Sequence, residues 1–141
     1  MSENRKFLTS IAELLDRLTV DQIKLIKMNK ESRPSLTQEI KDIKDDLDML
    51  IEKKKIKIDS EFLRIVASLS LINLYIWNLK DEMSQENKDY DKKLKLAHQL
   101  NGIRNQLKNY LLDLSSDMNE ASKRSNFGTD GLKDWNFNLD D

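Results

Sequence analysis

The chain has 141 residues, of which 35% are charged, and its 24 Lys and Arg nearly balance its 25 Asp and Glu to leave a net charge of −1. This length suits one domain with a substantial core, and the near-neutral charge argues against a dedicated DNA-binding protein. Because the chain has no cysteine, disulfides, thiol nucleophiles and thiolate metal sites are excluded. With few Gly and Pro, the composition favours an all-α, antiparallel bundle of about four long helices, in residues 1–115, before an arm of residues 116–141.

The first predicted helix runs from about Glu3 to Asn29, because apolar residues recur along it at helical spacing. Thr19 followed by Gln22 matches a capping box, in which hydroxyl and amide groups bind free backbone N–H groups at a helix start. A kink or break near Leu18 and Thr19 is therefore one alternative, and we favour a single helix with a perturbation there. The polar start, MSENRKFLTS, has no apolar segment of the kind found in signal peptides, so we expect a cytoplasmic protein.

The second predicted helix follows Pro34, with Ser35 as its N-cap and Gln38 completing a capping box. It should run from about Leu36 to Lys54. Its apolar residues alternate spacings of four and three, which is typical of a coiled-coil seam. These residues are Leu36, Ile40, Ile43, Leu47 and Leu50.

The stretch from Phe62 to Leu79 is the longest apolar segment of the chain. It predicts a helix that begins at a cap on Asp59 or Ser60 and extends to about Ser84. A helix that is apolar nearly all round belongs in an interior. The alternative is a membrane span, which needs about 20 mostly apolar residues. Charges at both ends and polar residues between them favour burial by neighbouring helices or by a second copy of the chain.

The fourth predicted helix runs from about Asp89 to Ser115, and Gly102 within it often marks the close approach of another backbone. Residues 116–141 then lose the helical pattern but keep large apolar side chains. We expect this arm to dock on the body, on a neighbouring subunit or on a protein partner, with plain disorder as the alternative. Its large apolar residues are Phe127, Leu132, Trp135, Phe137 and Leu139.

Two sets of polar residues each share one face of a predicted helix. They are Asn73, Trp77 and Asp81 on the central helix, and Asn101, Arg104 and Lys108 on the fourth. If these helices are antiparallel neighbours, Asp81 should meet Arg104 or Lys108. The result is either a buried network that fixes the register of the helices or a pocket for a small polar or anionic ligand, since arginine suits planar carboxylates and phosphates.

Glu13 and Asp16 share a face of the first helix at a spacing that suits a divalent cation, as in helical nucleotide pyrophosphohydrolases. Those enzymes need a second acidic pair, and the best match is Glu39 with Asp42, whose aspartate should face solvent. The single histidine, His98, lacks the Glu-x-x-His spacing of di-iron bundles. Without a phosphate-binding loop or aromatics among the basic runs, we expect no metal, no cofactor and no nucleic-acid partner.

Three stretches of this sequence resemble a family of small helical bacterial proteins of unknown function. They are ELLDRLTVDQIK (Glu13 to Lys24), NLYIWNLKDE (Asn73 to Glu82) and LAHQLNGIRNQLK (Leu96 to Lys108). The resemblance covers roughly residues 10–115, and some relatives occur near or fused to glycosyltransferases. It implies a fold and a set of residues, not a reaction. The chain departs from the family pattern at Lys80 and Gln22, where relatives are usually acidic.

The sequence thus favours an interaction or assembly protein that self-associates, most simply as a two-fold dimer. Its coiled-coil seam and apolar central helix offer more apolar surface than one copy easily covers. The alternative is a ligand-binding or enzymatic bundle with a polar pocket around Asp81 and Arg104.

Overall fold

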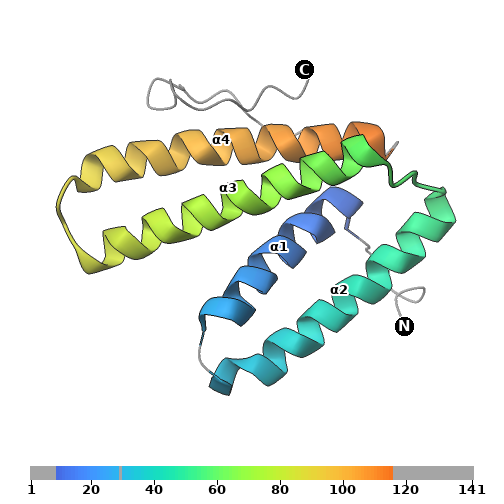
Figure 1. Ribbon diagram of the computed structural model, residues 1–141, viewed down its shortest axis with the longest axis horizontal. Coiled ribbons are helices and arrows are strands. Elements are labelled where there is room, and N and C mark those ends of the chain that lie inside the picture. Colours follow the sequence, from blue (N-terminus) through green and yellow to red (C-terminus); the bar gives the residue numbers. More distant parts are fainter. Residues whose placement is uncertain (1–8, 29, 116–141) are drawn as a thin grey trace.

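A computed structural model describes residues 9–28 and 30–115, and within these ranges the chain is helical with no strand. The four helices are α1 (Ile11–Lys27), α2 (Arg33–Lys54), α3 (Ser60–Gln85) and α4 (Tyr90–Leu114). They form two antiparallel hairpins, α1–α2 and α3–α4, and α1 packs against both helices of the second hairpin (Figure 1). The predicted all-α bundle is confirmed. The predictions for residues 116–141 lie outside the described residues.

The helix α1 begins where Ser10 caps it, since the Ser10 side chain accepts a hydrogen bond of 3.2 Å from the backbone N–H of Glu13. The favoured single helix is confirmed, and the alternative of a break near Leu18 is wrong, because α1 continues without interruption to Lys27. Thr19 does not start a helix, and its buried hydroxyl instead donates to the backbone oxygen of Asp16 at 2.7 Å.

The start of α2 also differs from the prediction. A short 3-10 turn (Lys30–Ser32) leads into the helix, and Pro34 lies in its first turn. Proline is tolerated there because the first helical N–H groups lack partners in any case. Ser35 is therefore inside the helix rather than at its cap, and the Gln38 side chain donates to Asp42 at 3.0 Å.

The predicted boundaries of the central helix are confirmed. Asp59 caps α3 by accepting a hydrogen bond of 3.0 Å from the backbone N–H of Phe62, and α3 ends at Gln85, close to the expected Ser84. The following connection turns the chain back into α4. Near this turn Lys93 of α4 lies 3.8 Å from the carboxylate of Glu82, which fits the antiparallel register of the two helices.

The core forms where α3 meets α1 and α4, around side chains with no exposed surface, among them Leu69, Ile72, Leu100 and Leu111. The α2 seam is buried against α1 through Leu36, Ile43, Leu47 and Leu50.

One face of α3 is left uncovered by the rest of the described chain, and on it Leu71 keeps 62% of its surface exposed. By length and composition α3 is the one described helix that could cross a membrane, with 39% of its most apolar window buried. The core helix of a soluble protein passes the same test, and α3 packs against both α1 and α4.

Two leucines of α3 test this division between core and surface. Leu69→Ala should lower the free energy of unfolding by about 3 kcal/mol, because it leaves a cavity at a fully buried position. Leu63→Ala, on the same helix but 58% exposed, should change it by less than about 1 kcal/mol. Urea unfolding followed by circular dichroism measures both, and equal losses would contradict the assignment of α3's buried face.

Candidate functional site

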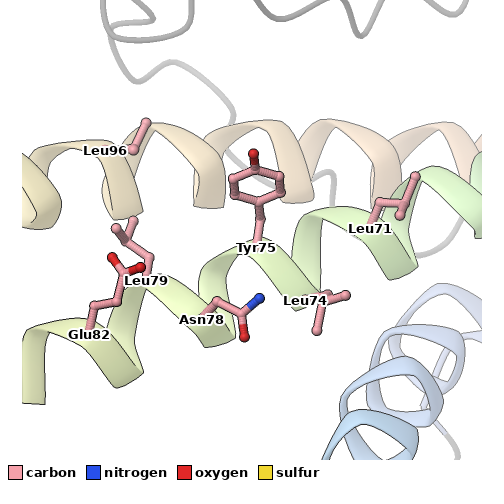
Figure 2. Close-up of a pocket in the computed structure, with 7 residues that line it drawn as sticks. All are labelled: Leu71, Leu74, Tyr75, Asn78, Leu79, Glu82 and Leu96. Atoms are coloured by element: carbon pink, nitrogen blue, oxygen red, sulfur yellow. The ribbon is translucent and has the colours of Figure 1, made fainter. Parts of the chain in front are cut away.

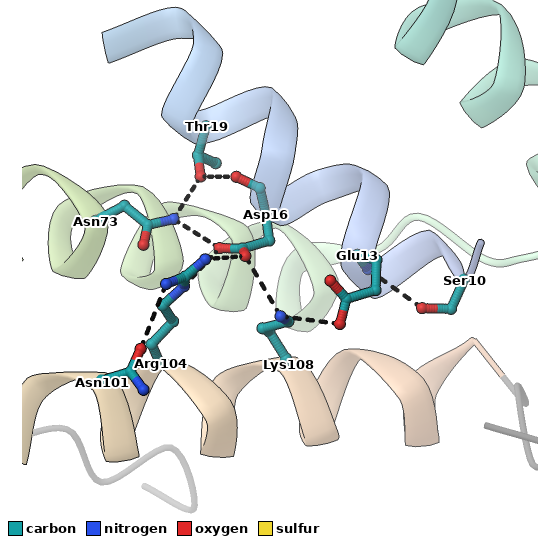
Figure 3. A network of polar contacts seen from close by, with 8 residues as sticks. All are labelled: Ser10, Glu13, Asp16, Thr19, Asn73, Asn101, Arg104 and Lys108. Carbon is teal, nitrogen blue, oxygen red and sulfur yellow. Dashed lines mark hydrogen bonds and ion pairs between the residues drawn. The ribbon is translucent and has the colours of Figure 1, made fainter. Parts of the chain in front are cut away.

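Asp16 lies at the centre of a polar network where α1, α3 and α4 meet (Figure 3). Its side chain is 4% exposed and is bound by two nitrogens of the Arg104 guanidinium fork, with Nε donating at 3.0 Å and a second nitrogen pairing with the other carboxylate oxygen. Lys108 lies 3.3 Å from Asp16 and 2.9 Å from Glu13. Two acidic groups of α1 are thus matched by two basic groups of α4.

The helix α3 joins this network through Asn73, which is 4% exposed. Its amide nitrogen donates to Asp16 at 2.9 Å and to the hydroxyl of Thr19 at 2.6 Å. On α4, Arg104 also donates to the side-chain oxygen of Asn101 at 3.3 Å. The spacing of these residues explains the meeting, since each helix presents them on one face.

Burial raises the pKa of Asp16, but hydrogen bonds from Arg104 and Asn73 and the positive charges of Arg104 and Lys108 outweigh it. The pKa of Asp16 therefore lies below its ordinary value, and the carboxylate stays ionised at neutral pH. A carboxylate held by two cations and an amide has little capacity left for a substrate. The network therefore joins three helices through the carboxylate of Asp16.

The structure brings together six of the predicted site residues and separates two others. Glu13, Asp16, Asn73, Asn101, Arg104 and Lys108 belong to the network. Asp81 does not, and the predicted pairing of Asp81 with Arg104 or Lys108 is wrong: Asp81 is exposed, and its carboxylate accepts a hydrogen bond of 3.4 Å from Gln85. Trp77 is half-buried on α3 and lies outside the network that Figure 3 draws.

The register of the α3–α4 hairpin explains this error. Glu82, next to Asp81, lies opposite Lys93 near the start of α4. Arg104 follows Lys93 by three turns of helix, which places it roughly 16 Å farther along the bundle. At that level of the bundle, the carboxylate within reach of Arg104 is that of Asp16 on α1.

The acidic pair considered for a divalent cation, Glu13 and Asp16, is engaged by Lys108 and Arg104 instead. The second pair, Glu39 and Asp42, lies on α2. Within residues 9–28 and 30–115, no group of three or more His, Cys, Asp or Glu side chains is placed to hold a metal ion. His98 is exposed on α4.

A second buried acid was missed by the sequence analysis. Asp21 of α1 is 4% exposed where α1 faces α2. Burial, a hydrogen bond with Glu39 and the negative charge of Glu39 raise the pKa of Asp21 from its ordinary value of 3.8 to about 6, against smaller opposing effects of Lys24 and Arg17. No pattern marked Asp21, because its surroundings depend on how α2 packs.

An apolar groove between α3 and α4 was also missed. It has a volume of about 420 Å³, and Figure 2 shows its walls. The lining residues are Leu71, Leu74, Tyr75, Asn78, Leu79 and Glu82 of α3 and Leu96 of α4. The sequence showed that the central helix is apolar on nearly all sides. It did not show which of these apolar residues other helices cover and which remain exposed to line a groove.

Replacing Asp16 should show how much the polar network contributes to the free energy of unfolding. Asp16→Asn keeps the shape of the side chain but leaves Arg104 and Lys108 without their central carboxylate, so the free energy of unfolding should fall by about 3 kcal/mol. Asp81→Asn, the matched change at the exposed acid, should alter it by less than about 0.5 kcal/mol. Urea unfolding compares the two variants, and a loss at Asp81 equal to that at Asp16 would contradict the network.

Asp21 predicts a pH dependence of stability with a defined sign. Since its folded-state pKa is raised, the folded protein binds the proton more tightly than the unfolded chain, and stability should fall as pH rises from about 4 to 6. Asp21→Asn should remove this fall and raise the melting temperature above pH 6. Asp16 acts in the opposite direction and below this window, because its pKa is lowered. Thermal unfolding at stepped pH tests this, and an unchanged profile in Asp21→Asn would contradict it.

Comparison with known protein families, with characterised proteins and with solved structures finds no match to this chain. The resemblance to small helical bacterial proteins therefore stays a prediction. Any functional conclusion has to come from the geometry of the bundle itself.

Proposed function

We propose that this protein is a helical assembly protein of the cytoplasm that self-associates as a two-fold dimer. The observation that carries the proposal is the exposed apolar face of α3, where Leu71 is 62% and Tyr75 is 54% exposed beside the groove. Since 35% of its residues are charged, the composition of the chain does not by itself require an apolar face to be exposed. Contiguous exposed apolar surface of this kind is typical of an interaction site.

The polar network favours assembly over ligand binding. Arg104, the residue best suited to hold a carboxylate or phosphate, is already occupied by Asp16. The groove, in contrast, is lined mainly by leucines and a tyrosine, with Asn78 and Glu82 as its polar members. The core of a homodimer interface has this composition, with aromatic and aliphatic side chains at its centre and polar ones at its rim.

Self-association is tested by light scattering coupled to size-exclusion chromatography. At micromolar concentration the full chain should have twice the 16.6 kDa mass of one chain. Leu71→Glu should shift the mass to one chain, because it places a charge in the centre of the apolar face.

Ile58→Glu is the matched control, since Ile58 is an apolar residue 42% exposed in the loop before α3. It should leave the mass at two chains. A wild-type protein that runs as a clean monomer would refute the proposal.

A further inference from the structure

On the exposed face of α3, residues are placed symmetrically before and after the level of Asn73, and residues at matching positions are complementary in charge or are both apolar or aromatic. Arg64 and Glu82 lie equally far from Asn73 along the helix, one before it and one after it. Leu71 and Tyr75 lie equally far from Asn73 as well. All four are exposed, and their spacing places them on one side of α3, opposite the side that carries the buried Asn73.

We propose that two copies of this chain pair through antiparallel α3 helices, with the two-fold axis at the level of Asn73. Arg64 then meets the partner subunit's Glu82, and Leu71 meets the partner subunit's Tyr75. Because the axis repeats each contact, the pair has two ion pairs at its ends and two apolar contacts at its centre. This inference rests on the proposed self-association and specifies its register.

The charges select the antiparallel direction. In a parallel pair of α3 helices, Arg64 would face a second arginine and Glu82 a second glutamate, which costs free energy. In the antiparallel pair, every charge at these positions meets its opposite. The ion pairs also lie at the rim, roughly 27 Å apart along the helix, with the leucine and tyrosine between them. An apolar centre within a polar rim is the usual anatomy of an interface.

The groove gives the partner helix a place to lie. Its walls come from α3 and from Leu96 of α4, and Figure 2 shows Leu71 and Tyr75 on the side of α3 nearer α4. A partner's α3 lying there would bring the two α3–α4 hairpins into one arrangement of four antiparallel helices, as in four-helix bundles. Glu82 already lies 3.8 Å from Lys93 and remains 60% exposed, so a second cation can approach it.

Charge reversal tests the register. Arg64→Glu alone places two glutamates together at each end of the pair, and Glu82→Arg alone places two arginines together. Each variant should therefore dimerise at least about tenfold more weakly than the wild type. An equal mixture of the two variants should recover the wild-type affinity. In the mixed dimer, one end joins the introduced glutamate to the introduced arginine, and the other end keeps the original pair of Arg64 with Glu82. Light scattering over a dilution series measures the three affinities.

Lys80→Glu is the control, since it reverses an exposed charge close to Glu82 on a different side of α3. It should dimerise like the wild type, and circular dichroism should show the same helix content in all variants. Variants that dimerise as tightly as the wild type, or a mixture as weak as its components, would overturn the proposed register while self-association stood. A monomeric wild type would remove the proposed function as well.

Discussion

The ion pair between the buried carboxylate of Asp16 and the half-buried Arg104 is the constraint on which the arrangement of helices depends. It joins α1 to α4, and Asn73 adds α3 through the same carboxylate. A desolvated carboxylate is costly unless it is fully paired, so any relative rotation or slide of these helices that separates the partners is disfavoured. These polar contacts form only in the observed register of the three helices, whereas leucine contacts depend less strongly on register.

The network and the groove lie on different faces of the α3–α4 hairpin. On the side that meets α1, charges are matched and polar atoms find partners within the chain. On the other side, large apolar residues such as Leu71 remain exposed. This division supports the proposed role in assembly, in which the polar interior maintains the shape of the bundle and the apolar surface makes the contacts.

Much of the fold could be predicted from the sequence, but the partners within the site could not. Apolar periodicity and the Asp59 cap located α3, because both depend on residues close in the chain. The capping box at Thr19 raised the alternative of a break that the structure does not have, because the same hydroxyl bonds within a continuous helix and to Asn73. Arg104 was recognised as a site residue, yet its partner depended on the α3–α4 register and on the docking of α1, which no local pattern specifies.

The two hydrogen bonds of Asn73 have a consequence for the opposite side of its helix. Since they fix the rotation of α3 about its own axis, they also fix the direction in which Leu71 and Tyr75 point. A surface held in this way loses little conformational freedom when another molecule covers it, which strengthens association without any added contact. The buried Asn73 thereby preorganises the exposed face on the opposite side of α3, although it makes no contact there.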